Sequence, residues 1–457
     1  MRKYLEIFLF LLAVVVLFIP SLSNGFPYLF SDSGTYINAG FTNEVPIDRP
    51  IAYSLFLRLS SFSYSLWIAV FVQLCLVAHV LYLFLKDIVQ LKYPGFALVI
   101  LTFLLGLSTA LANVSNQVMP DIHAALLLLL IIIHFKAKTR LSYWISLFYL
   151  LVFIPFHNTN LLLFAGAWPL GYLLFGVKTW RKFGLVAVVY LLGLISIPLV
   201  NYTVQKEFFY SKSSGLFLTS SLLEMGVAQD YLARHCPEAP SFMCGVEHPE
   251  DAGSMAFLWS MESPLIDSAC LARGGWGQCW KEKNDTMSVF VRNVLSDNQS
   301  RKLFIQHGWK AFGDQLSTFS IGHLTSQALN SSVYVPLTSH YPKDKAAYET
   351  ANQFNEDLFF PELTNRQNWL LWLSLPLFVL VVYREKEQRK TFLFIALFIV
   401  VYLLANAAVC GVLSNPVNRY QARLMWLWPF FLLGWSLKPT FWKRSNDENT
   451  DVMEHSA

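Results

Sequence analysis

Charged side chains are scarce in this chain of 457 residues, since aspartate, glutamate, lysine and arginine together make up only 14% of it. A soluble globular protein carries about 25%. The sequence also lacks a block of lysines and arginines and any nucleic-acid-binding motif, so we expect no nucleic-acid partner. No internal repeat or low-complexity tract is present, apart from a polar tail after Arg444 that we expect to be disordered.

A signal-peptide cleavage motif is missing as well. The apolar run 4–22 follows the basic start Met1-Arg2-Lys3, but it is longer than the core of an ordinary signal peptide, and no small-x-small site comes after it. We therefore interpret this run as an uncleaved first membrane helix, with a signal peptide as the alternative.

What the chain has in excess is apolar residues, at 55%, gathered in long runs. Crossing a hydrocarbon core of about 30 Å takes about 20 mostly apolar residues. About ten runs are candidates: 4–22, 63–85, 95–112, 119–135, 142–156, 158–176, 183–201, 368–383, 391–413 and 421–437. The two runs on either side of His157 are short, so a re-entrant pair is the alternative there.

The distribution of lysine and arginine predicts the orientation. With the N-terminus in the cytoplasm, the short outer segments carry only Arg49, Arg58, Arg419 and Arg423, and every short inner segment carries basic residues. This bias is the one that sets topology, and it places both termini in the cytoplasm. The compact cytoplasmic loops suit a bacterial inner membrane, with a site facing the periplasm or exterior. Outer sequons, such as the one at Asn201, leave an endoplasmic reticulum as the alternative.

The sequence therefore predicts an all-α polytopic membrane protein. We divide it into an N-terminal transmembrane module, 1–201, with a long outer loop at 24–62, an extracytoplasmic domain at 202–367, transmembrane helices at 368–437 and a cytoplasmic tail at 438–457. The outer segment 202–367 is long enough for a small domain.

Four cysteines lie in that outer segment: Cys236, Cys244, Cys270 and Cys279. Exported cysteines favour disulfides, and we expect 236–244 and 270–279 because each pair closes a short loop. A zinc site is the alternative, although the spacings are wider than in usual structural zinc sites.

An apolar pattern at helical spacing predicts a helix within 296–317. This helix either packs on the outer domain or lies on the membrane surface. The residues that carry the pattern are Leu303, Phe304, Trp309, Phe312 and Leu316.

Two acidic residues are placed for chemistry at the outer boundary. Asp32 follows the first membrane helix, where it can reach a substrate at the membrane surface or simply cap a short helix. Asp121 opens the fourth predicted membrane helix, where the helix dipole favours a carboxylate; its functional alternative is to converge with Asp32 on a substrate hydroxyl or a metal ion. His157, in the next outer turn, either contacts an anion or is solvated.

The outer arginines are the matching cationic groups. Arg419 and Arg423 are four residues apart and so share a helix face. Their planar guanidinium groups suit phosphate oxygens, and snorkelling to lipid headgroups is the alternative. Arg49 either pairs with the neighbouring Asp48 or faces a phosphate.

Taken together, these positions resemble the GT-C superfamily of polytopic glycosyltransferases, which includes protein O-mannosyltransferases and the aminoarabinose transferases of lipid A. The resemblance covers mainly 1–200 and 410–435. Its motifs are Ser31-Asp32-Ser33-Gly34-Thr35-Tyr36, the stretch Pro46 to Tyr53, Asp121, and Arg419-Tyr420 ahead of an aromatic last helix. Many relatives have two adjacent acidic residues in the first loop, whereas this chain has Asp32 alone.

The resemblance implies an inverting transfer of a sugar from a polyprenyl-phosphate donor to a glycan, lipid or protein acceptor on the outer side. Asp32 would be the general base, with a pKa raised by the apolar surroundings. Arg419, with Arg423 or Arg49, would stabilise the leaving phosphate. Asp121 would orient the acceptor or hold a divalent cation such as Mg²⁺ or Mn²⁺, with Asp32 as the other ligand. Tyr36, His157 and Tyr420 complete the expected substrate-binding set.

Two other classes stay open. A polymerase or ligase of surface polysaccharide would use a diphosphate-linked glycan at a similar site. A lipid or solute transporter would carry ionisable groups near the bilayer midplane or broken helices, and the predicted spans have few ionisable groups apart from His79 and His134.

Overall fold

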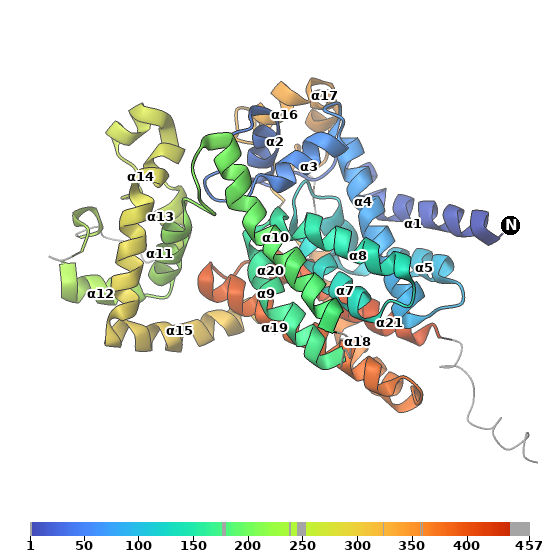
Figure 1. Ribbon diagram of the computed structural model, residues 1–457. Helices are drawn as coiled ribbons and strands as arrows, with labels where there is room; N and C mark the ends of the chain where they lie inside the picture. Colours follow the sequence, from blue (N-terminus) through green and yellow to red (C-terminus); the bar gives the residue numbers. More distant parts are fainter. Residues whose placement is uncertain are drawn as a thin grey trace, which may run out of the picture.

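The computed structural model describes residues 2–175, 180–236, 239–244, 253–322, 324–356, 358 and 360–438, and these residues are almost entirely helical (Figure 1). Within the described ranges, the nearest approach to a strand is a single parallel bridge between Tyr28 and Gln117. The expected all-α architecture is therefore confirmed. Of the predicted cytoplasmic tail, only Lys438 lies inside the described residues.

Four helices in the described part of the chain are long and apolar enough to cross a membrane: α1 (Arg2–Asn24), the continuous stretch of α4 and η1 (Leu66–Val89), α10 (Trp180–Gln205) and α19 (Arg389–Leu413). In α1 and α10 most of the apolar window is exposed rather than packed against the protein. Apolar helix surface of this extent requires an apolar surrounding, as expected of a membrane protein.

The other predicted spans are helical as well, but several are shorter than expected. They form α5 (Pro94–Ser108), α7 (Asp121–Lys136), α8 (Arg140–Phe153), α9 (Asn158–Phe175) and α18 (Pro361–Arg384).

The last predicted span, 421–437, is not one helix. It divides into α20 (Asn418–Met425) and α21 (Leu427–Ser436). Pro429 lies in the first turn of α21, where it has no N–H to donate to the carbonyl of Met425 and its ring crowds that carbonyl. The expectation of a single continuous helix here was wrong.

Helix α7 is the centre of the bundle. Its residues from Asp121 to Phe135 are all buried, and it contacts α4, α8, α9, α19 and α20. A helix that is apolar all round is stable only when neighbours cover every face. Asp121, the first residue of α7, is therefore a buried carboxylate at one end of this central helix.

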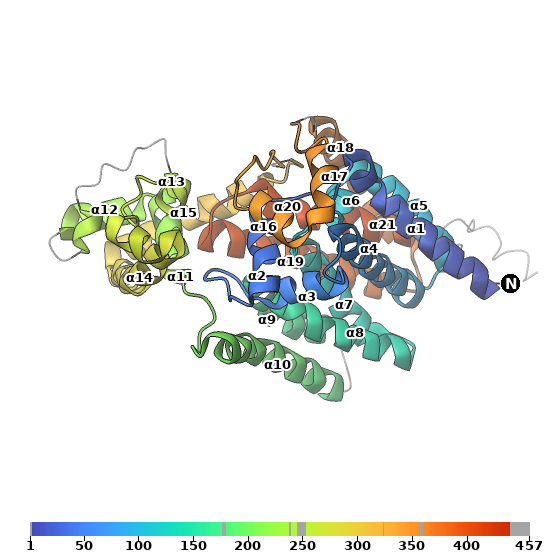
Figure 2. The same ribbon diagram turned by 90° about the horizontal axis from the view of Figure 1, so that it is seen from above.

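The outer segment 202–367 divides between two cores. Helices α11 (Ser214–Glu224), α12 (Val227–His235), α13 (Gly253–Trp259) and α14 (Ser268–Ser296) share an apolar core of their own beside the bundle (Figure 2). The later residues pack instead on the first outer loop, where α16 (Tyr334–His340) covers α2 (Ser33–Thr42). A side chain at Gly34 would meet the backbone of Ser332, so this contact requires glycine.

The predicted helix within 296–317 is α15 (Asn298–Ser317), which runs along α19 (Figure 1). Leu303 and Phe304 pack against the core that α11, α12, α13 and α14 share, and we call these four helices the outer module. Trp309, part of the same apolar pattern, has 70% of its surface exposed. The helix thus joins the outer module to the bundle and presents an aromatic side chain outward.

The four outer cysteines form the two expected disulfides. Cys236 bonds to Cys244 and Cys270 bonds to Cys279, which leaves these thiolates unavailable to the alternative zinc site. Cys75 and Cys410 are free and lie within the bundle.

Reduction is expected to loosen the outer module selectively. Closing loops of 8 and 9 residues removes entropy from the unfolded chain that corresponds to about 2.5 kcal/mol each. Limited proteolysis should therefore show new cuts within 214–296 after dithiothreitol, with the bundle intact. Alkylation of the unreduced, denatured protein should label Cys75 and Cys410 alone, and six reactive thiols under those conditions would contradict the pairing.

Candidate functional site

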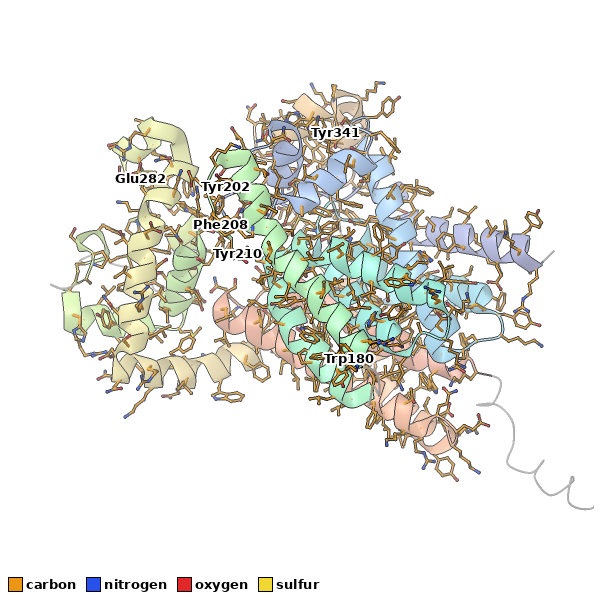
Figure 3. All side chains as sticks on the ribbon, in the orientation of Figure 1. Trp180, Tyr202, Phe208, Tyr210, Glu282 and Tyr341 are labelled. Carbon is orange, nitrogen blue, oxygen red and sulfur yellow. A yellow bond between two sulfur atoms is a disulfide. The ribbon has the colours of Figure 1, made fainter. Side chains whose placement is uncertain are left out.

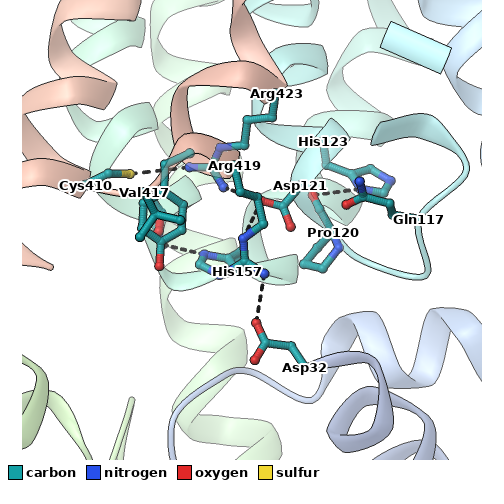
Figure 4. A network of polar contacts seen from close by, with 12 residues as sticks. Asp32, Gln117, Pro120, Asp121, His123, His157, Cys410, Val417, Arg419 and Arg423 are labelled. Carbon is teal, nitrogen blue, oxygen red and sulfur yellow. Dashed lines mark hydrogen bonds and ion pairs between the residues drawn. The ribbon is translucent and has the colours of Figure 1, made fainter. Parts of the chain in front are cut away.

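Six charged side chains converge at one end of the helices, three carboxylates and three guanidinium groups that balance in charge. They come from the first outer loop, the start of α7 and helix α20, and each is within ion-pair distance of an opposite charge. The six are Asp32, Asp48, Asp121, Arg49, Arg419 and Arg423. Figure 4 shows Asp32, Asp121, Arg419 and Arg423 among them.

Asp32 occupies the position before α2 but does not cap it. Ser33, the first residue of α2, does not cap it either, since its hydroxyl accepts from the N–H of Phe30 and donates to the carbonyl of Val118. The Asp32 carboxylate is left to accept from Arg49 Nη2 and Arg419 Nη1, each at 3.1 Å. The alternative of a simple helix cap is therefore not what the structure contains.

Arg49 forms ion pairs with two carboxylates of its own loop, Asp32 and Asp48. Its Nε donates to both oxygens of Asp48 at 3.0 Å, while Nη2 reaches Asp32. The guanidinium also lies 5.1 Å from the centre of the Tyr36 ring, a cation–π distance. Tyr36 itself is fully buried, and its hydroxyl has no hydrogen-bond partner.

Asp121 and Arg423 form the most deeply buried ion pair of the cluster. The distance between Asp121 Oδ1 and Arg423 Nη1 is 3.0 Å, and the two side chains are 2% and 1% exposed. Arg423 Nη2 also contacts Asn406 Oδ1 at 3.0 Å and Cys410 Sγ at 3.6 Å, both on α19. Sequence reasoning missed Asn406, although an amide inside a predicted span is a signal of function.

Arg419 bridges the two carboxylates. It lies one turn before Arg423 on α20, as the spacing predicted, and its Nε is 4.0 Å from Asp121 while Nη1 reaches Asp32 (Figure 4). That Nε has no hydrogen-bond partner. Arg419 also lines a small cavity of about 10 Å³, so an arginine with an unused donor borders a space inside the site.

The expected rise in the Asp32 pKa was wrong. Burial favours the protonated carboxyl, but Arg49 and Arg419 outweigh it and hold the Asp32 pKa below its usual range. Burial likewise opposes the charge on Arg419, yet Asp121 and Asp32 raise the Arg419 pKa. Proximity to the apolar interior suggested the opposite sign for Asp32, because the sequence could not show two guanidinium groups within contact distance.

His157 and Tyr420 lie beside this cluster. Burial and the nearby charge of Arg423 lower the His157 pKa to about 4, and its Nδ1 accepts from the N–H of Thr159. The Tyr420 ring centre is 5.3 Å from the Arg419 guanidinium and 5.6 Å from that of Arg423. His157 is therefore neutral near pH 7, which does not suit the anion contact considered from sequence.

The lowered pKa predicts a pH dependence of stability. Because the folded protein disfavours protonated His157, the contribution of this residue is complete above about pH 6.5 and is lost as the pH falls toward the folded pKa of about 4. His157→Gln should flatten the fall in thermal unfolding temperature between these values. His307→Gln, on α15, controls for histidine content. Equal slopes for wild type and His157→Gln would contradict the assignment.

The carboxylates do not form an evident metal site. Among the described residues, no group of three or more histidine, cysteine, aspartate or glutamate side chains is arranged to hold a metal ion. Asp32 and Asp121 each accept from an arginine, so a divalent cation between them would have to displace a guanidinium. The residues present fit an anion better than a cation.

An apolar groove of about 500 Å³ lies between α15 and α19. All of its lining is apolar: Phe304, Ile305, Gly308, Trp309, Phe312, Val401, Leu404, Ala405, Ala408 and Val412. Asn406 and Cys410, on the same stretch of α19, contact Arg423. The groove and the charged cluster therefore share one helix.

The three comparisons with known proteins add no relative. No protein-family model, no curated protein and no solved structure matches the chain. The function therefore has to be argued from the charged cluster, the cavity beside it and the apolar groove.

Proposed function

We propose that this protein is a membrane glycosyltransferase that moves one sugar from a polyprenyl-phosphate carrier to an acceptor outside the cytoplasm. The observation that carries the proposal is Arg419, which joins Asp32 and Asp121, keeps an unpartnered Nε and lines a cavity. The oxygens of a phosphodiester can accept the hydrogen bond that this Nε–H group has to donate.

The lipid-linked donor follows from the surroundings of the site. A site on the outer side has no access to cytoplasmic nucleotide sugars, so a donor tethered in the membrane meets the need. The groove of about 500 Å³ between α15 and α19 offers apolar walls to the hydrocarbon chain. The arginines on the neighbouring α20 would then meet the phosphate at the end of that chain.

Binding of the donor would also activate the base. In the resting site Asp32 is held by two arginines and is a weak base. The phosphate brings one more negative charge to a balanced cluster and competes with Asp32 for Arg419. Both effects raise the pKa of Asp32 toward the range useful for proton transfer.

The reaction is a single displacement. The acceptor oxygen forms a bond to the anomeric carbon as its proton passes to Asp32, while the bond from that carbon to the phosphate oxygen breaks. The electron pair leaves with the polyprenyl phosphate, and Arg419 and Arg49 stabilise the added charge. The anomeric centre inverts. Asp121 is too buried to meet the acceptor, so we assign it to holding the two arginines of α20.

The arrangement in the membrane extends the four long apolar helices to the ten predicted spans, with α20 and α21 together in place of the last one, and has both termini in the cytoplasm. Exposed aromatic residues support this placement, because tryptophan and tyrosine gather at membrane boundaries. Trp180 and Tyr202, which are 74% and 50% exposed, lie near opposite ends of α10 (Figure 3). A bacterial plasma membrane with an outward-facing site fits the compact inner loops.

Arg419→Ala should lower the affinity for the donor. Loss of a charge-assisted hydrogen bond to phosphate corresponds to about 1.5–3 kcal/mol, or roughly tenfold to a hundredfold in dissociation constant. Arg419→Lys should restore only part of it, because an ammonium group cannot contact Asp32 and phosphate in the same planar geometry. Binding of farnesyl phosphate to the detergent-solubilised protein measures both. Unchanged affinity in Arg419→Ala would refute the phosphate role.

The test of the function as a whole is lipid analysis of a deletion strain. We expect a polyprenyl-phosphate sugar to accumulate and a surface glycan, lipid or protein to lack one residue. Accumulation of a diphosphate-linked glycan would identify a polymerase or ligase instead. If neither lipid accumulates, the glycosyltransferase proposal fails and a transporter becomes the better explanation.

A further inference from the structure

The cavity beside Arg419 has a polar wall that the proposed reaction does not yet use. Asn113 and Gln117 line one side, from the end of α6 (Ala110–Ser115) and the turn that follows it. The non-helical residues Ser320, Ile321 and Gly322 line another. The volume of about 10 Å³ is room for about one water molecule.

Gln117 presents an unsatisfied acceptor in this wall. The residue is 4% exposed, its Nε2 donates to Asn113 Oδ1 at 3.0 Å, and its Oε1 has no hydrogen-bond partner. Its backbone carbonyl accepts from Gln73 Nε2 at 3.0 Å, which fixes the turn. A buried amide oxygen left without a donor is unfavourable, so a ligand hydroxyl entering here would supply a donor that no protein group provides.

We infer that Gln117 is a specificity-determining residue that accepts a hydrogen bond from a hydroxyl of the transferred sugar. The inference rests on the proposed function. In a glycosyl phosphate the sugar ring is joined to the phosphate through one bridging oxygen. A phosphate on the free edge of Arg419 therefore has its sugar within reach of the other residues lining the same cavity, Gln117 among them.

The non-helical part of the cavity wall has to move to admit a sugar ring. It is held by tethers rather than by helix: Ser320 N–H donates to Asn418 Oδ1 at 2.8 Å, and Ile321 N–H donates to Thr364 Oγ1 at 2.9 Å. Gln367 Nε2 donates to the carbonyl of Phe319 at 3.1 Å. Releasing these few bonds opens the cavity without unfolding a helix, and the sugar hydroxyls can replace them.

The test compares farnesyl phosphate with a panel of farnesyl-phosphate monosaccharides, binding each to the full-length protein in detergent. Wild type should bind at least one glycosylated probe more tightly than farnesyl phosphate. Gln117→Met, which keeps the volume and removes the amide, should lose about threefold to tenfold of that difference and bind farnesyl phosphate as before. Gln117→Asn, which draws the amide back by one methylene, should act in the same direction if the methionine variant does not fold.

Gln73→Met is the matched control, since it removes a buried amide that holds the same turn but does not line the cavity. It should shift the affinities for both probes together. The inference is overturned if wild type gains nothing from the sugar, or if a folded Gln117 variant keeps the full difference. The proposed function itself fails separately, if wild type does not bind farnesyl phosphate at all.

Discussion

Asp32→Asn is expected to slow sugar transfer about 10²–10⁴-fold, the usual contribution of a general base. Asparagine keeps the shape of the side chain but cannot take up the acceptor proton. The rate is measured with the purified protein in proteoliposomes, using a polyprenyl-phosphate sugar and an acceptor identified from the deletion strain.

The same variant should bind the donor at least as tightly as wild type. The neutral amide no longer competes with phosphate for Arg419, which is 3.1 Å from Asp32 in the resting site. A fall in rate together with a rise in affinity separates loss of the base from general damage. Asp48→Asn, which alters Arg49 alone, is the control and should keep most of the rate. Transfer within about threefold of wild type in Asp32→Asn, far less than a base contributes, would rule out the role of Asp32.

Asp121→Ala should have the largest effect on folding. It leaves Arg423, which is 1% exposed, without its carboxylate in a low-dielectric site. Removing one partner of a buried ion pair costs about 3–5 kcal/mol. Thermal or denaturant unfolding in a mild detergent measures the change.

The double variant Asp121→Ala with Arg423→Met shows whether the lost stability comes from the unpaired charge or from lost packing. Once the unpaired charge is gone, the double variant should be less destabilised than the sum of the two single changes, with a coupling of about 0.5–3 kcal/mol. A loss below about 0.5 kcal/mol in Asp121→Ala, the range of surface substitutions, would mean that the pair does not hold the site together.

Much of this architecture was predictable because the deciding signals are local. Apolar runs predicted helices in nearly every case, since a long apolar segment has few other ways to satisfy its backbone. The disulfide pairing followed from loop length. The failure at 421–437 also had a visible cause, because Pro429 interrupts the run in its middle.

The residues that form the site were easier to predict from the sequence than their pKa values. The resemblance assigned Asp32 and Arg419 to one site, and the two side chains are in contact. The spacing of Arg419 and Arg423 correctly placed both on one face of α20. The lowered pKa of Asp32 was missed, because it depends on distances between segments that are remote in sequence. The position of Gln117 beside the cavity depends on such distances as well.

Asp32 and Arg419 are separated by 387 positions in the chain and meet in one ion pair. A ribosome completes the acidic half of the cluster long before it reaches the arginines of α20. Until those residues are made and inserted, Asp121 has no partner from that helix, and a chain that stops short of it has neither a complete site nor a neutralised bundle. The proposed activity and the charge balance of the buried cluster thus depend on the same two turns of helix.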